Sequence, residues 1–209
     1  MIDRSSAGPR PSRGTRSRPN LRRRAIEDVA ADLFRERGYG STSIRDIARA
    51  LDLQGASLYA HVASKEDVLW SIVDRAAGRF EAAAREVEAA TAGGDATSRL
   101  AALVRAHVRV VTDDVEEASV FVHEWRSLGP DRREAIRERR DAYEARFRRV
   151  IADGMAGGEF RLTDVPIAAA FILTALNGIV TWYRPDGRLS PEQIADLYAD
   201  LAVGSVLSG

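Results

Sequence analysis

The chain has 209 residues, of which 45% are hydrophobic and 30% charged, so it is long enough for one or two folded domains and too apolar to be disordered throughout. It contains no cysteine, which excludes disulfides, thiolate metal sites and cysteine nucleophiles and favours a cytoplasmic protein. The formal net charge is zero, but residues 1–65 carry +6 and the remainder −6, which excludes a uniformly neutral surface and suits nucleic acid at one end only.

Residues 1–19 have the composition of a basic arm that cannot bury a core. Five arginines lie among Gly, Pro and Ser, and no apolar run marks a secretory signal. We interpret this segment as disordered, either an extension that only aids solubility or an arm that follows DNA.

The next segment predicts two helices. From Asn20 onward apolar residues recur at the spacing of one helix face, and Gly38 ends the helix. Ser43 and Asp46 have the spacing of a capping box and begin a second, short helix that ends near Leu51.

A third helix of two turns fits residues 55–61, after a tight connection. Ser64 and Asp67 repeat the capping-box spacing and begin a long fourth helix, whose inward apolar residues extend to Val87. Three short helices followed by a long one are typical of a helix-turn-helix head.

Three more helices are predicted in the first part of the remaining chain. A fifth follows the glycine break at residues 93–94, and a sixth includes Trp125 and ends at residues 129–130. A seventh, over residues 131–153, is expected to be closed by glycines beginning at Gly154.

Two last helices complete the prediction. Asp164 can cap an eighth helix, and Ser190 begins a ninth, with Pro191 at the first helical position and Gln193 at the third. The apolar stretch 165–183 approaches the length of a membrane span, but we interpret it as a helix buried on several faces and expect no membrane partner. No stretch alternates with a period of two, so the predicted class is all-α with nine helices.

Residues 24–70 resemble the head of the TetR family of bacterial transcription regulators. The matching segments are Ala25-Ile26, Leu33-Phe34, Gly38-Tyr39, Thr42–Ala48, Ser57–Val62 and Ser64–Leu69. The resemblance implies a three-helix DNA-binding head over residues 20–65 and a six-helix body over residues 66–209. Such a body binds a small effector and forms a homodimer, here expected through the eighth and ninth helices, with no cofactor or metal.

The third helix has a first turn without bulk, because residues 55–57 are Gly, Ala and Ser, as entry into a major groove requires. Arg45 suits guanine and Gln54 suits adenine, whereas hydroxyl, imidazole and ammonium groups suit phosphates. Each residue also has a structural interpretation, with Tyr59 partly in the core or His61 bracing the next helix. The predicted contacts with double-stranded operator DNA are Thr42, Ser43, Arg45, Gln54, Gly55, Ala56, Ser57, Tyr59, His61 and Lys65.

The body resembles the branch of the family that responds to acyl-CoA thioesters. The segments that carry this resemblance are Glu124–Arg126, Arg139–Glu144, Gly158–Arg161 and Trp182–Gly187. It implies an apolar tunnel for the acyl part and arginines of the seventh helix for the phosphates. The predicted effector residues are Trp70, His107, Phe121, Glu124, Trp125, Arg139, Tyr143, Phe147, Phe171, Asn177 and Trp182.

Other interpretations of the body remain open from sequence. Aromatic residues at helical spacing also suit a plain core, and a regulator that senses lipophilic cations would use Glu124 and the aromatic faces. A helical enzyme using His107 with Glu124 is a further alternative, although the acidic residues are scattered and no Gly-rich phosphate loop follows a strand. A metal site at His107, His123 and Glu124 would require two helices to pack antiparallel, and we do not expect one.

Overall fold

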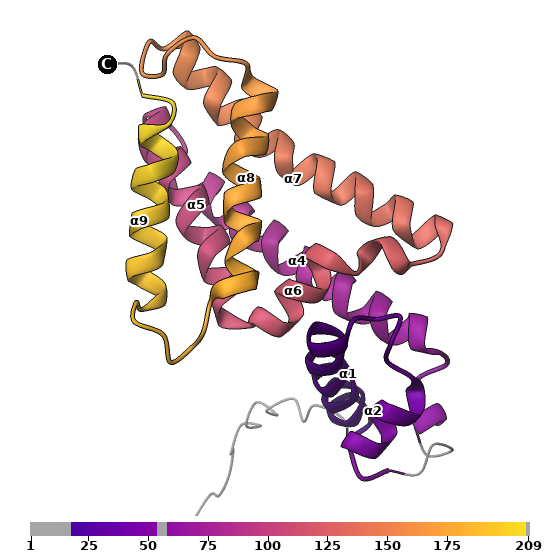
Figure 1. The fold of residues 1–209 in the computed structure, drawn as a ribbon. Coiled ribbons are helices and arrows are strands. Elements are labelled where there is room, and N and C mark those ends of the chain that lie inside the picture. The colour runs from indigo at the N-terminus through magenta and orange to yellow at the C-terminus, as the bar shows by residue number, and fades with distance from the viewer. Residues whose placement is uncertain (1–17, 54–57, 208–209) are drawn as a thin grey trace, which may run out of the picture.

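The computed structural model describes residues 18–53 and 58–207, and within them every regular element is a helix (Figure 1). The β-type contact in these ranges is one isolated antiparallel bridge between Phe160 and Leu207. The all-α prediction is therefore confirmed. In chain order the elements are α1 (Arg18–Arg37), α2 (Ile44–Ala50), α4 (Lys65–Ala90), α5 (Ala96–Asp113), α6 (Val115–His123), the 3-10 turn η1 (Trp125–Ser127), α7 (Pro130–Ala156), α8 (Val165–Trp182) and α9 (Pro191–Gly204).

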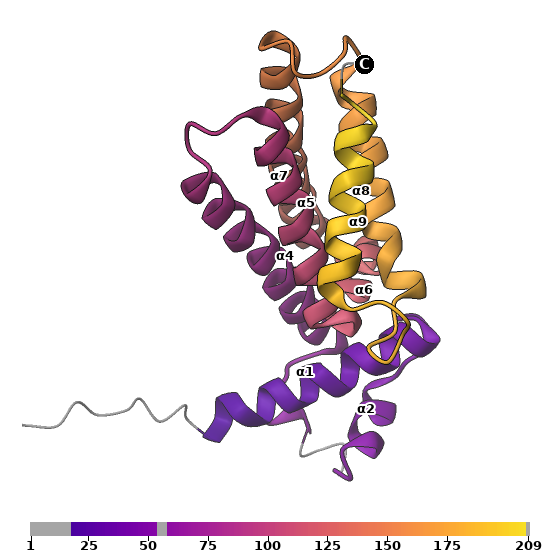
Figure 2. The same cartoon turned by 90° about the vertical axis from the view of Figure 1, so that its left-hand side faces the viewer.

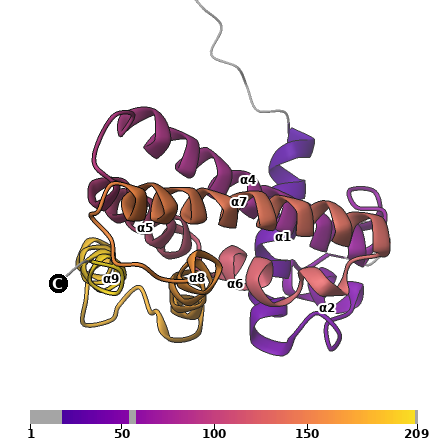
Figure 3. The ribbon, with the colours of Figure 1, turned by 90° about the horizontal axis from the view of Figure 1, so that it is seen from above.

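The helices form a small head and a larger body. α1, α2 and the first turns of α4 lie together at one end, and α4 runs from there into the body (Figure 1). In the body α5 packs against α4, α7 and α9. α8 and α9 stand on the side away from α4 (Figure 2), and from above they are seen nearly end-on while α4 and α7 cross the other side (Figure 3).

Side-chain caps fix most helix starts where the sequence predicts them. Ser43 and Ser190 each accept from the third helical N–H and complete a capping box, and Asp164 caps α8 by accepting from the N–H of Ile167 at 2.9 Å. Ser64 caps α4, but only half of the predicted box forms there. The carboxylate of Asp67, the expected partner, accepts instead from Arg132 at 2.6 Å.

The sixth helix ends earlier than predicted. α6 stops at His123, and η1 continues the chain with a bond from the Ser127 N–H to the Glu124 carbonyl at 2.9 Å. In a 3-10 turn, side chains three residues apart lie nearly in line. Trp125 and Leu128 are accordingly both buried, 8% and 3% exposed.

Gly154 does not close the seventh helix as predicted. It lies inside α7 and is buried, and a Cβ atom built on it would be 2.3 Å from Cδ2 of Phe160. Glycine is therefore required at this position because the Phe160 ring packs directly on the helix backbone. The helix ends instead at Gly157 and Gly158, the second with a φ of +76° that favours glycine.

Candidate functional site

The head is held together by buried apolar residues from each of its described segments. Phe34 of α1, Ile47 of α2, and Leu58 and Val62 of the following segment are at most 3% exposed. They belong to the same continuous core as the buried residues of the body. This shared core therefore fixes the segments that carry the outward side chains of the head.

Lys65 ties the loop between α1 and α2 to the start of α4. Its Nζ donates to the carbonyl oxygens of Tyr39 and Thr42, both at 2.8 Å, and lies 4.0 Å from the centre of the Tyr39 ring. An ammonium group has three N–H donors, so one remains for a further acceptor. A phosphate contact by Lys65 stays a prediction, to which the structure adds this bracing role.

Thr42 lies inside the same loop, unlike the sequence prediction of a side chain that contacts DNA. The residue is 2% exposed, and its hydroxyl donates to the Gly38 carbonyl at 3.0 Å. Gly38, at a φ of +80°, turns the chain so that this carbonyl comes within reach. Thr42 therefore shapes the loop from within, whereas Ser43 remains at the surface while capping α2.

Arg45 and Tyr59 are two exposed residues among the predicted DNA contacts. Arg45 is exposed, and Tyr59 is 59% exposed, which removes the interpretation of this ring as core. His61 is half-buried. The predicted contacts that lie outside the described residues are Gln54, Gly55, Ala56 and Ser57. For this whole set the DNA contact stays a prediction.

The body contains a cavity of about 330 Å³ between α4, α5, α7 and α8, with α6 and η1 at one end. Its size lies at the small end of the usual range for ligand pockets. Phe80 of α4 and Leu173 of α8 form part of the wall. Six of the predicted effector residues also line it: His107, Phe121, Trp125, Arg139, Tyr143 and Asn177.

The other predicted effector residues lie elsewhere. Phe147 is fully buried in the core behind Tyr143, with ring centres 5.6 Å apart. Phe171 and Trp182 lie on the outer face of α8, 62% and 46% exposed. Trp70 lies under the guanidinium of Arg132, 5.5 Å from its carbon. These corrections share one cause, because a helical repeat shows which residues are apolar but not what each side of the helix meets.

Two arginines that line the cavity, Arg137 and Arg139, are each paired with two acids. Arg139 donates to Asp74 at 2.7 Å and to Glu81 at 2.6 Å, and Arg137 is paired with two acids of its own helix. The sequence predicts Arg139 as a cation for the phosphates, whereas in the structure this arginine is already paired with two acids.

Two further arginines of the cavity wall, Arg126 and Arg140, lie beside aromatic rings instead of acids. The guanidinium carbon of Arg140 is 5.0 Å from the ring centre of Phe121 and 5.3 Å from that of Trp125, and that of Arg126 is 4.7 Å from Trp125. Within the described ranges neither arginine has a carboxylate oxygen within 4.0 Å. Burial, and then the charge of Arg126, lower the pKa of Arg140.

His107 is buried in the cavity wall and pairs with Tyr143, with 3.2 Å between Nδ1 and the phenol oxygen. Burial, with a smaller contribution from Arg140, lowers the pKa of His107 to about 3, and burial raises that of Tyr143. Nε2 of His107 and Nε1 of Trp125 are buried and lack a hydrogen-bond partner among the described residues. The wall therefore carries two polar groups that an occupant could satisfy.

We expect His107 to make the protein acid-sensitive. Above pH 6.5 the imidazole is neutral in both states; as the pH falls from 6.5 towards 3, the unfolded chain binds a proton that the folded protein does not, so stability is lost. The loss due to this residue should reach about 3 kcal/mol at pH 4. Urea unfolding of the wild type and of His107→Gln from pH 7.5 to 4 measures it. If the free energy of unfolding falls equally with pH in the two proteins, His107 is not the cause of the acid sensitivity.

Glu124 does not line the cavity but links it to the head. Its Oε1 accepts from the backbone N–H of Tyr39 at 3.2 Å, and the next residue is Trp125 of the cavity wall. At the far end of η1 the Gly129 N–H donates to Glu66 of α4 at 3.1 Å. The segment that closes the cavity is thus fastened at both ends to the part of the chain that carries the head.

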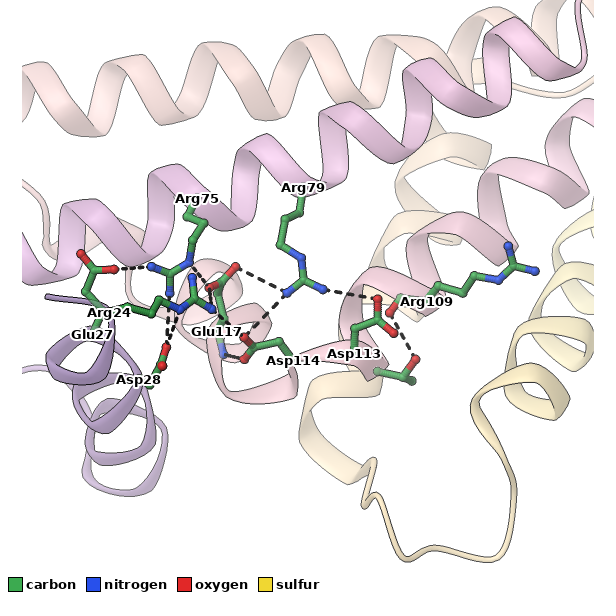
Figure 4. A network of polar contacts seen from close by, with 10 residues as sticks. Arg24, Glu27, Asp28, Arg75, Arg79, Arg109, Asp113, Asp114 and Glu117 are labelled. Carbon is green, nitrogen blue, oxygen red and sulfur yellow. Dashed lines mark hydrogen bonds and ion pairs between the residues drawn. The ribbon is translucent and has the colours of Figure 1, made fainter. Parts of the chain in front are cut away.

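An ion-pair network joins the head to the body (Figure 4). Arg75 of α4 donates both to Glu27 of α1 and to Glu117 of α6. Arg79 lies 3.6 Å and Arg24 lies 3.8 Å from Glu117, whose side chain is 1% exposed. Burial raises the pKa of Glu117, an effect that the surrounding arginines oppose. Three helices therefore share one buried carboxylate.

The outer surface of α8 and α9 is apolar and uncovered in the single chain. Ile167 and Phe171 of α8 are 68% and 62% exposed, and Leu197 and Leu201 of α9 are 50% and 71% exposed. Small residues, such as Ala175, lie between them. We call this surface the α8–α9 face. By length and composition alone α8 could cross a membrane, a property that buried helices of water-soluble proteins share.

His107 and Glu124 do not come together as the enzyme alternative requires. The first contacts Tyr143 and Phe80, and the second accepts from the Tyr39 backbone. In the part of the chain that the structure describes, no three His, Asp or Glu side chains are grouped as a metal site would need.

Two family models match the chain. Residues 26–72 match the model described as "Bacterial regulatory proteins, tetR family", and residues 93–206 match "Tetracyclin repressor-like, C-terminal domain". Among curated relatives, the HTH-type transcriptional repressor KstR2 of Rhodococcus jostii is 30% identical over 90% of this chain and 92% of its own. The fatty acid metabolism regulator protein of Bacillus subtilis is 24% identical over 87% of this chain and 93% of its own.

Solved structures give the same result. The ketosteroid transcriptional regulator KstR2 of Mycobacterium tuberculosis superposes with a TM-score of 0.85 at 27% identity, over 94% of this chain and 98% of its own. AibR, in complex with isovaleryl coenzyme A and operator DNA, superposes with a TM-score of 0.76 at 31% identity, over 86% of this chain and 97% of its own.

Proposed function

Because the chain belongs to the TetR family of bacterial regulatory proteins, we propose that it is a cytoplasmic, homodimeric repressor that an acyl-CoA thioester releases from a palindromic operator. In this proposal residues 20–65 form the DNA-binding domain, residues 66–209 the effector and dimerisation domain, and residues 1–19 a basic arm. The family is one of regulators and not of enzymes, so we assign no reaction to the cavity.

The observation that carries the effector class is the chemistry of the cavity wall. Aromatic rings from α4, α6 and α7 provide apolar surface, and Arg126 and Arg140 provide positive charge with no carboxylate oxygen within 4.0 Å among the described residues. An amphiphilic anion fits this combination, whereas a lipophilic cation would be repelled by both guanidiniums. That AibR is described with isovaleryl coenzyme A supports a thioester over a free acid.

For the head we propose that Arg45 reads a base edge while Tyr59 and Lys65 hold phosphates. The side chains of Arg45 and Tyr59 are both exposed, which is what a contact with DNA requires. Two heads of a dimer about 34–36 Å apart would reach successive major grooves on one side of the duplex, and would therefore read a palindrome.

The test is a gel shift with an operator selected from genomic fragments. Arg45→Ala should weaken operator binding by about 10- to 100-fold and relax the base preference, because a base contact is lost. Tyr59→Phe should weaken binding to all sequences alike, because a phosphate contact is lost. Arg148→Ala, an exposed position on α7, is the matched control and should leave affinity unchanged.

The same assay tests the effector by adding isovaleryl-CoA and other acyl-CoA thioesters, their free acids and a cationic dye. Release by a thioester, with little effect of the corresponding acid, is the expected result. Operator affinity unchanged in both head variants would contradict the DNA assignment. Release by the cation alone would replace the acyl-CoA proposal with a regulator of drug efflux.

A further inference from the structure

The cavity contains two guanidiniums on the same indole ring. Arg126 and Arg140 lie 4.7 and 5.3 Å from the Trp125 ring centre, so two like charges are held near each other at one end of the cavity. Cation–π contacts offset part of the repulsion, but a ring does not neutralise a charge as a carboxylate does. The pair therefore leaves positive charge at this end of the wall.

The other two arginines of the wall differ from this pair in their contacts with acids. Arg137 and Arg139 each lie within hydrogen-bonding distance of two carboxylates, whereas the described part of the chain brings none within 4.0 Å of Arg126 or Arg140. Arg140 is half-buried and Arg126 is exposed, and an unpaired cation that is partly removed from water destabilises the empty protein. Such a cation is retained at a functional site when a bound ligand provides the opposite charge.

Two uncharged groups of the same wall also lack an acceptor. The indole N–H of Trp125 can only donate, and it is buried without a partner among the described residues. Nε2 of His107 is likewise buried without one, and because Tyr143 can donate to Nδ1, Nε2 can carry the proton and donate as well. The imidazole and the indole therefore add two unpartnered nitrogen groups to the arginines of this wall.

We propose that Arg126 and Arg140, with the indole N–H of Trp125, form a subsite that binds an oxygen anion of the effector, a carboxylate or a phosphate. This inference rests on the proposed effector response and deepens it, because it locates the charge of the ligand. Planar guanidiniums match both kinds of oxygen anion, and the low polarity around the rings strengthens each bond. Arg139, which the sequence favours, is excluded from this role by its two acids.

The test measures binding by calorimetric titration with four probes: isovaleryl-CoA, isovaleryl-pantetheine, isovalerate and inorganic diphosphate. Arg140→Met and Arg126→Met should each weaken the tightest anionic probe by about 10- to 100-fold, the loss of one charge-assisted bond. Arg137→Met is the matched control, since this arginine lines the same cavity but is already paired, and it should change affinity less than about threefold. If isovaleryl-CoA binds and isovaleryl-pantetheine, which lacks the phosphates, does not, the subsite holds a phosphate. If isovalerate binds, the subsite holds a carboxylate.

The melting temperature without ligand separates a binding role from a structural one. Arg140 is half-buried and has no carboxylate within 4.0 Å among the described residues. Removing this charge should leave the melting temperature of Arg140→Met equal to or above that of the wild type, while ligand binding is lost. A lower melting temperature with unchanged affinity would overturn the inference, as would failure of every anionic probe to bind the wild type. If operator release persists with an anion but neither arginine matters, the subsite is wrong and the proposed function stands.

Discussion

Replacing Arg75 with methionine should lower the free energy of unfolding by about 3–5 kcal/mol, the usual cost of removing one partner from a buried ion pair. The guanidinium bridges Glu27 and Glu117, whose side chains are 8% and 1% exposed. Without it, both carboxylates remain buried, and Glu117 keeps only the longer contacts with Arg79 and Arg24. Chemical unfolding at a fixed protein concentration, followed by circular dichroism, measures the loss.

Two variants control for this interpretation. Arg79→Met removes a more exposed guanidinium that lies 3.4 to 3.7 Å from its acids, and should cost about 1 kcal/mol. Adding Glu117→Gln to Arg75→Met removes the stranded charge and should recover part of the loss. If Arg75→Met costs no more than Arg79→Met, the network does not stabilise the junction between head and body.

The second large effect is expected on the α8–α9 face. If this face forms the dimer interface, Ala175→Glu should raise the dissociation constant of the dimer by at least about 100-fold, because each subunit would bury an unpaired carboxylate near the twofold axis. Ala175 is exposed in the single chain, so the substitution should not disturb the fold of a subunit. Light scattering at micromolar protein should report a monomer.

Ala89→Glu is the matched control for the dimer experiment. Ala89 is an exposed alanine of α4. The helix α4 lies on the side of the body away from α8 and α9 (Figure 2). This variant should remain dimeric. A dimer that survives Ala175→Glu would remove α8 from the interface and leave its exposed Phe171 and Ile167 without a proposed partner.

Local signals made most of the fold predictable. Caps such as Ser43 and Ser190 depend on residues a few positions apart, so their spacing in the sequence already fixes the helix starts that the structure confirms. Gly154 shows the limit of such signals. A glycine near a helix end resembles a terminator, and only the tertiary contact with Phe160 reveals that it is a packing position.

The candidate site was predictable only in part, because the direction in which a side chain leaves its helix decides what it contacts. Arg139 and Arg140 are neighbours in sequence but point about 100° apart on α7, so one meets the acids of α4 and the other meets Phe121 and Trp125. Lys65 shows a related limit, since a basic residue at a helix start predicts a phosphate contact equally well whether or not it also braces a loop. The DNA contacts themselves remain predictions.

The Glu124 bond to the Tyr39 backbone has a consequence for anyone who wishes to retune this protein as a biosensor. The segment after Glu124 supplies Trp125 and Arg126 to the cavity, and the same segment holds the loop in front of α2. If the chain is the proposed repressor, we expect a change in this segment to affect ligand preference and operator binding together. Leu173 and Asn177 line the cavity from α8, which packs on α5, α6 and α7, and a redesign should begin with them.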